Sequence, residues 1–183
     1  MKYVLLIVSI LGLVVFASGC TSSDAINMNN TFSKGGLTFN YPSFYTEATG
    51  VDRISASQGV ELLGTYEDSD ADTNGDANFA LLDVRKSSLD GYTVEDEYKA
   101  QRKSLTQNGF ALLSDTQSTI NGVKIYEFIY KTSDPTSGEE IKGTYMLFGN
   151  GKYSYSIQIQ GPADQFEKYN NVTEEVKNTI KLQ

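Results

Sequence analysis

The chain has 183 residues, with 23 Asp and Glu against 15 Lys and Arg, a net charge of −8, no His and one Cys; this length suits a single domain. The lack of His excludes a histidine general base and a Ser-His-Asp triad, and one Cys without His excludes an intrachain disulfide and a zinc finger. The acidic balance argues against a nucleic-acid partner, because such binding draws on clustered Lys and Arg.

The first 19 residues have the layout of an export signal. Lys2 precedes an apolar run over residues 3–17, which is shorter than the ~20 residues of a spanning helix. Small residues then lead to Cys20, and this end resembles a lipobox, although Leu is commoner where Ala17 stands. We therefore expect Cys20 to carry lipid and to anchor the protein on the extracytoplasmic face of the membrane. Ordinary cleavage and an uncleaved anchor are the alternatives.

Residues 20–34 are rich in Ser, Thr and Asn and show little apolar periodicity. That composition is typical of a flexible polar tether, so we expect the folded domain to span residues 35–183. Glycosylation acceptor patterns begin at Asn29 and Asn171, but a three-residue pattern is common by chance.

Short strands are expected in the first half of the domain. Residues 37–41 alternate apolar and polar side chains before a proline, which predicts a strand. Residues 51–56 and 59–66 have weaker strand patterns, and residues 79–86 read as a strand with few polar interruptions.

Residues 94–107 are predicted to form a helix. Thr93 and Asp96 have the spacing of a capping box. A sparse apolar face predicts that the helix lies on a sheet with its other side in water. That face consists of Val94, Tyr98 and Leu105.

Four strands and a helical segment are expected after this helix. The strands are predicted over residues 110–119, 123–131, 141–148 and 153–160, and Asn121-Gly122 is a strong hairpin signal. The second strand is apolar on both faces, which places it inside a sheet covered on both sides.

Pro162 suits the start of the closing helical segment, which we expect Asn170-Asn171 to interrupt. A second helix should follow, with apolar residues at Val172, Val176 and Ile180. Antiparallel strands with separate helices indicate an α+β fold.

Several segments resemble the PsbP/Mog1 superfamily, over about residues 35–183. They are GLTFNYP at 36–42, NGVKIYEFIY at 121–130, KGTYMLF at 142–148 followed by GKYSYSI at 151–157, and the closing helix. The resemblance implies an antiparallel sheet between helices, an α-β-α arrangement. The superfamily includes a photosystem II extrinsic protein, a Ran-binding nuclear transport factor and prokaryotic lipoproteins. These members share no catalytic motif, so no functional residue is carried over.

An acidic segment is the candidate metal site. Its spacing matches the first half of an EF-hand calcium loop, and the candidate ligands are Asp70, Asp72, Asn74 and Asp76. The twelfth position is Leu81 where a bidentate Glu is needed, so Asp83 or water would have to substitute. We expect weak Ca²⁺ binding at most, and a solvated acidic turn is the alternative.

The function expected from these observations is a non-enzymatic, lipid-anchored PsbP-like adaptor that docks a protein partner at the membrane surface. The alternative is a calcium- or small-ligand-binding module, and an unrecognised hydrolase is more remote. Nine Tyr and Phe between residues 126 and 169 could form a stacking platform for flat ligands, but core packing explains them more simply. Neither Ser-x-x-Lys nor Gly-x-Ser-x-Gly occurs.

Overall fold

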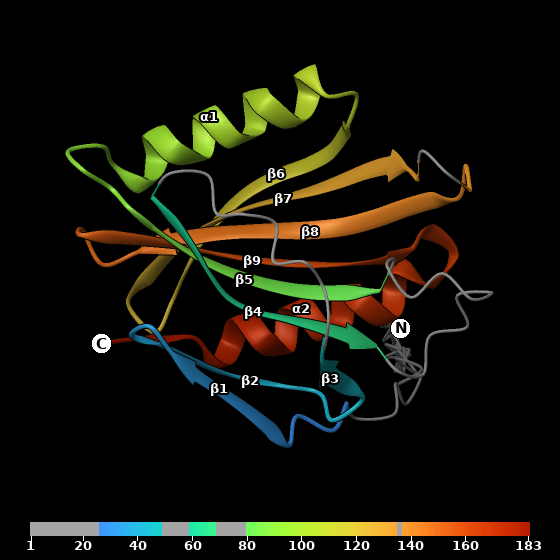
Figure 1. The fold of residues 1–183 in the computed structure, drawn as a ribbon, viewed down its shortest axis with the longest axis horizontal. Coiled ribbons are helices and arrows are strands. Elements are labelled where there is room, and N and C mark those ends of the chain that lie inside the picture. The colour runs from blue at the N-terminus through green and yellow to red at the C-terminus, as the bar shows by residue number, and fades with distance from the viewer. Residues whose placement is uncertain (1–25, 49–58, 69–79, 135–136) are drawn as a thin grey trace, which may run out of the picture.

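The computed structural model describes residues 26–48, 59–68, 80–134 and 137–183. Its elements form three layers (Figure 1). Helix α1 (Val94–Gln107) lies on one face of a large sheet, and helix α2 (Phe166–Thr179) lies on the other face together with a small second sheet. The fold is α+β, as the sequence predicted.

The large sheet is antiparallel throughout and has seven strands. In spatial order they are β3 (Tyr45–Glu47), β4 (Val60–Asp68), β5 (Leu81–Ser88), β9 (Tyr153–Pro162), β8 (Glu140–Gly149), β7 (Val123–Ser133) and β6 (Ala111–Ile120). The six longer strands confirm the predicted ones, and β3 was not predicted. The strand expected over residues 51–56 lies outside the described residues.

The small sheet corrects the predicted tether. It consists of β1 (Asn30–Lys34), β2 (Leu37–Tyr41) and β10 (Lys181–Leu182). Strand β1 pairs with β2 along its whole length, and Phe32 is 2% exposed with its ring stacked 4.8 Å from that of Phe39. The boundary at residue 35 is therefore wrong, because the polar run that looked like a tether contains one deeply buried aromatic anchor.

The helix predicted over residues 94–107 forms as α1, with the predicted capping box. The Thr93 hydroxyl accepts a hydrogen bond from the backbone N–H of Asp96 at 3.1 Å, and the Asp96 carboxylate accepts one from the backbone N–H of Thr93 at 3.0 Å. Tyr98 packs its ring 5.0 Å from Tyr126 and 5.8 Å from Phe128 on the sheet. The apolar face of α1 thus covers one side of β7, as predicted.

The predicted break at Asn170-Asn171 is wrong. A 3₁₀ turn at Ala163–Gln165 leads into α2, which runs without interruption to Thr179. Asn costs a helix at most about 0.7 kcal/mol relative to Ala. Burial of the neighbouring Tyr169 and Val172 against the sheet outweighs that cost.

The main core lies between the large sheet and the layer made by α2 and the small sheet. Gly161 on β9 permits close packing there, because a Cβ at this position would lie 2.0 Å from the Tyr169 ring. Strand β7 has buried residues on both faces, with Ile125 in the main core and Phe128 beneath α1. This confirms its predicted place inside the sheet.

Strand β6 forms one edge of the large sheet and carries an irregularity. Its register with β7 shifts between Leu112 and Ser114, and Leu113 between them is 50% exposed. The β6–β7 hairpin turns at Asn121-Gly122 with positive φ at both residues, as the sequence predicted.

Candidate functional site

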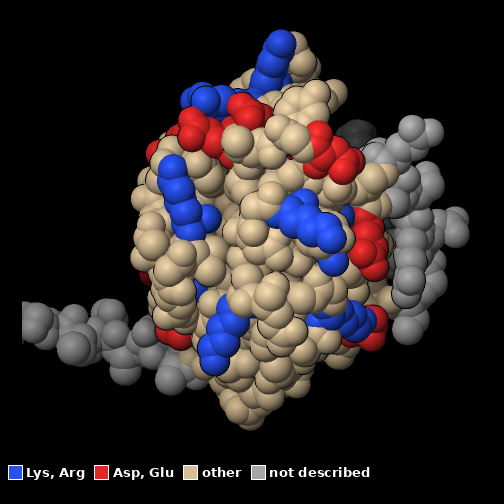
Figure 2. All heavy atoms as spheres, turned by 90° about the vertical axis from the view of Figure 1, so that its left-hand side faces the viewer, with Lys and Arg blue, Asp and Glu red and all other residues tan. Residues whose placement is uncertain are grey.

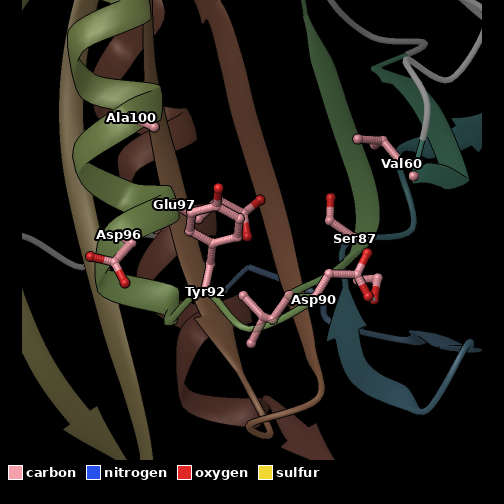
Figure 3. Close-up of a pocket in the computed structure, with 10 residues that line it drawn as sticks. Val60, Ser87, Asp90, Tyr92, Asp96, Glu97 and Ala100 are labelled. Carbon is pink, nitrogen blue, oxygen red and sulfur yellow. The ribbon is translucent and has the colours of Figure 1, made fainter.

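A pocket lies between α1, the loop that precedes it and the first residues of β4 (Figure 3). Its volume is about 400 Å³, within the range of small-molecule sites. Its lining is Gly59, Val60, Ser87, Ser88, Leu89, Asp90, Tyr92, Asp96, Glu97 and Ala100. Among the described residues, this lining offers carboxylates, hydroxyls and apolar surface and includes no Lys or Arg.

The loop from Leu89 to Thr93 shapes the pocket. Leu89 is buried, and its N–H bonds the carbonyl of Lys152 at 3.1 Å. Asp90 and Gly91 then adopt positive φ values of 42° and 93°, a tight reversal that few side chains adopt without strain. The reversal turns Tyr92 outward, so that 72% of it is exposed, and its ring stands beside Glu97 in the pocket (Figure 3).

The three carboxylates of the pocket have different surroundings. Asp90 accepts a hydrogen bond from the Ser88 hydroxyl at 2.6 Å. Asp96 belongs to the capping box, and the hydrogen bonds from the Thr93 hydroxyl and N–H hold the pKa of its carboxyl below the usual value. Glu97 has no such local bond among the described residues. Its carboxylate is the one best placed to receive a hydrogen-bond donor or a cation.

A second polar group lies on the α1 face of the large sheet. Gln158 donates to the Tyr130 hydroxyl at 2.7 Å, and that hydroxyl donates to Gln160 at 2.6 Å. Gly143 stands between these strands and leaves room for the hydroxyl. Burial raises the pKa of Tyr130 well above its usual value, so the phenol stays protonated. This network ties β7 to β9 and therefore has a structural role.

An ion pair with a buried carboxylate lies at the C-terminal end of β4, at Asp68. The Asp68 carboxylate is fully buried and lies 2.5 Å from the Lys168 ammonium, and the Tyr169 hydroxyl donates to it at 3.1 Å. Burial and the charge of Asp68 both raise the pKa of Tyr169. Asp68 is one of the acids that precede the candidate metal segment, and in the structure it joins α2 to β4.

The predicted site residues Cys20, Asp70, Asp72, Asn74 and Asp76 lie outside the described residues. Asp83, the suggested substitute ligand, lies on β5, where it accepts hydrogen bonds from Thr65 at 2.7 Å and Arg85 at 2.6 Å. In the part of the chain that the structure describes, no three acidic or thiol side chains group into a metal site. Asn29 and Asn171 are both exposed.

The aromatic stretch is core, as the simpler interpretation predicted. Seven of its nine Tyr and Phe are buried. Tyr126, Phe128 and Tyr130 lie beneath α1, where Phe128 stacks on Tyr145 at 4.9 Å. These rings present no platform for a flat ligand.

The described helices include none that is long and apolar enough to cross a membrane.

Sequence reasoning missed the pocket. The reversal Asp90-Gly91 just before a capping residue was its one local signal, because such a turn displays the next side chain. The other walls come from the start of β4, the end of β5 and the first two turns of α1, which only the fold brings to this place.

Among solved structures, the chain is similar to cyanobacterial PsbP from Synechocystis sp. PCC 6803, with 16% identity and a TM-score of 0.58 over 90% of this chain and 98% of that one. The chain has a PsbP-like fold. A second similar structure is LpqN, involved in cell envelope biogenesis of Mycobacterium tuberculosis, with 11% identity and a TM-score of 0.59 over 84% of this chain and 90% of that one.

A third similar structure is a Pseudomonas aeruginosa protein of unknown function, described as a putative regulator, with 8% identity and a TM-score of 0.51 over 84% of this chain and 96% of that one. No family model matches the chain, and no curated protein matches its sequence. The resemblance read from the sequence is therefore confirmed at the level of the fold, and identities this low carry no function across.

Proposed function

We propose that the protein is a non-enzymatic adaptor, anchored by lipid on Cys20 to the extracytoplasmic face of the membrane, where its PsbP-like domain docks a protein partner. The observation that carries this proposal is the position of β1. Asn30, where the fold begins its first strand, stands ten positions after Cys20. Ten extended residues span at most about 36 Å.

Such a short connection would hold the domain against the membrane surface. A tethered domain meets partners in the same membrane at a high effective concentration, which suits docking more than diffusion to distant targets. The fold shared with a cell-envelope protein, LpqN, supports this location.

Affinity capture of the full-length protein from detergent-solubilised membranes tests the adaptor role. We expect one membrane or envelope protein to be recovered in near-stoichiometric amount. We expect the same protein to be lost from the capture when Cys20→Ala releases the bait from the membrane. Recovery of no partner above the level of an unrelated lipoprotein bait would contradict the proposal.

The pocket favours a second candidate function, the binding of a small ligand. Its carboxylates and the exposed ring of Tyr92 suit a small organic cation, because an ammonium group can pair with Glu97 and lie against an aromatic face. Thermal shift with a panel of amines would detect such binding. Tyr92→Ala should remove the shift. Leu113→Ala is the matched control, since it removes an exposed apolar side chain away from the pocket.

A further inference from the structure

Five lysines gather at one end of the PsbP-like domain, and we call this surface the lysine end. Figure 2 views this end, with basic side chains standing around a mostly uncharged surface and acidic side chains mainly toward the upper rim and one side. The lysines are Lys34, Lys86, Lys124, Lys152 and Lys181. They come from strands β1, β5, β7 and β10 and from the turn before β9.

Contacts between the turns establish that these lysines share one end. The Lys86 ammonium donates to the carbonyl of Gly35, next to Lys34, at 3.0 Å. Lys181 pairs with β2 just beyond that turn. The β6–β7 turn, which precedes Lys124, is tied to the end of α2 by a 3.0 Å bond from the Asn121 amide to the carbonyl of Asn178.

Tyr153 holds two of the lysines together. The Lys86 ammonium lies 4.1 Å and the Lys152 ammonium 5.1 Å from the centre of its ring. An aromatic face attracts cations without neutralising them. The two positive charges are thus positioned side by side and remain available to an incoming anion.

The charges of the lysine end are largely unneutralised. Lys34 pairs with Glu47 at 3.2 Å, whereas the other four have no carboxylate within 4.0 Å among the described residues. Glu61 stands opposite Lys86 across the β4–β5 pair without forming an ion pair, and Glu95 lies beside Tyr126, under Lys124, but pairs with Lys99. Four cations on one end thus have no ion-pair partner among the described residues, in a chain whose net charge is −8.

We propose that the lysine end is the docking surface of this protein and that it binds an acidic surface on a partner protein. The inference rests on the proposed adaptor function and names the face and the chemistry of the partner. Complementary charges of this kind steer association and set its salt dependence.

The direction of β1 favours a protein partner over an anionic lipid surface. The strand runs from Asn30, opposite Tyr41, to Lys34, opposite Leu37, so the chain arrives from the predicted anchor at the far end of the domain from the lysines. The lysine end therefore points away from the anchored side. The net charge of the whole chain would also oppose close approach to anionic lipid.

Site-specific photo-crosslinking of the full-length protein in its own membranes tests the inference. A photoreactive residue at Thr119, an exposed position paired with Lys124, reports on the lysine end. The same residue at Thr106, exposed on α1, is the control. We expect crosslinks from position 119 to an Asp- and Glu-rich segment of one protein. Their yield should fall as salt rises from 50 to 500 mM, because the Debye length then shortens from about 14 to about 4 Å and the charges are screened.

Charge reversal provides the second arm. K86E/K152E should lower the crosslink yield from position 119 by about tenfold, and K124E/K181E should do so without disturbing Tyr153. Lys103→Glu, on α1, makes the same kind of change away from this end and should leave the yield unchanged. An unchanged yield in both double variants would overturn the inference.

The remaining outcomes separate this inference from the adaptor role. Crosslinks from position 106 but none from 119 would overturn the lysine end as the docking face and leave the adaptor role standing. Crosslinks from 119 to phospholipid would show a membrane contact and overturn the inference. A partner absent from both the crosslinks and the affinity capture would overturn the adaptor role and the inference together.

Discussion

Lys177 on α2 is held in a buried ion pair. Its ammonium lies 3.0 Å from Glu127 on β7 and 2.6 Å from Glu174, and the side chains of Lys177 and Glu127 are 10% and 12% exposed. Lys177→Met leaves the Glu127 charge buried without its cation, which should cost about 3 kcal/mol of unfolding free energy. Urea unfolding measures the loss. Lys99→Met removes an exposed pair on α1 and should leave the midpoint unchanged.

The same lysine gives a pH signature. Burial lowers its pKa, but the hydrogen bonds and charges of Glu174 and Glu127 outweigh burial, so the pKa is raised above its usual 10.5. Its contribution to stability is complete below pH 10.5 and is lost as the pH rises through the raised value. Buried tyrosines titrate in the same range, since burial raises the pKa of Tyr145 to about 12. The contribution of Lys177 to the pH dependence is therefore measured as the difference in unfolding free energy between the wild type and the Met variant at each pH.

Gly161 is required by the ring of Tyr169, because a Cβ would lie 2.0 Å from a ring carbon. Gly161→Ala should destabilise the protein by about 1–3 kcal/mol through overpacking. A double-mutant cycle with Tyr169→Ala measures how much of this loss comes from the contact with the Tyr169 ring. If the clash is responsible, the second substitution removes most of the cost of the first, and strictly additive losses would refute the explanation.

At the scale of elements, α1 depends on its cap. Thr93→Ala removes the hydroxyl that accepts from the Asp96 N–H and should cost about 1 kcal/mol, whereas Thr93→Ser should retain most of the stability. The pKa of Asp96 is lowered by the hydrogen bonds from Thr93. Its contribution is present above the usual 3.8 and is lost as the pH falls through the lowered value. Thermal melts at pH 7 and pH 3 should therefore differ less in the Ala variant.

Strand β1 sets the minimal folded unit. A chain of residues 35–183 lacks Phe32 and one of the two strands that pair with β2, and loss of a buried Phe alone costs about 3–5 kcal/mol. We expect residues 26–183 to melt sharply and residues 35–183 to melt at a clearly lower temperature or to aggregate. Phe32→Ala in the longer chain should reproduce much of the difference. Equal melting temperatures would show that β1 is dispensable.

Elements with local signals could be predicted from the sequence. The capping box of α1, the Asn121-Gly122 turn and the two-faced pattern of β7 each specify a structure within a few residues. The hairpin of β1 and β2 also had a signal in Gly35-Gly36, but Phe32 is the single strongly apolar residue within β1 itself. The continuity of α2 had no local signal, since it depends on packing against the sheet.

At the scale of the whole molecule, the proposed lipid anchor on Cys20 would decide where the domain works. Cys20→Ala should move the protein from the membrane fraction to the soluble fraction or leave an uncleaved precursor, because stable attachment needs two or more acyl chains. Metabolic labelling with palmitate and intact mass of the purified protein report the change. A variant that keeps both the wild-type mass and its membrane retention would exclude lipidation at this residue.

The lysine end and the pocket could not be predicted from the sequence, because each is assembled from distant segments. Lys34 on β1 and Lys181 on β10 are far apart in the sequence and become neighbours only through β2. Lysines scattered singly along an acidic chain read as ordinary surface residues. The fold gathers them, and the predicted fold class did not specify which turns would meet.

The register shift in β6 also bears on how copies of this protein would coexist if the proposed lipid anchor concentrates them on a membrane. The outer strand of a sheet offers unpaired backbone groups that can template the strand of another copy. The shift at Leu112 and Ser114 breaks the regular spacing of those groups and turns Leu113 outward. Two such edges cannot join along their full length, so the domain can be concentrated at a surface without its sheets fusing into fibrous aggregates.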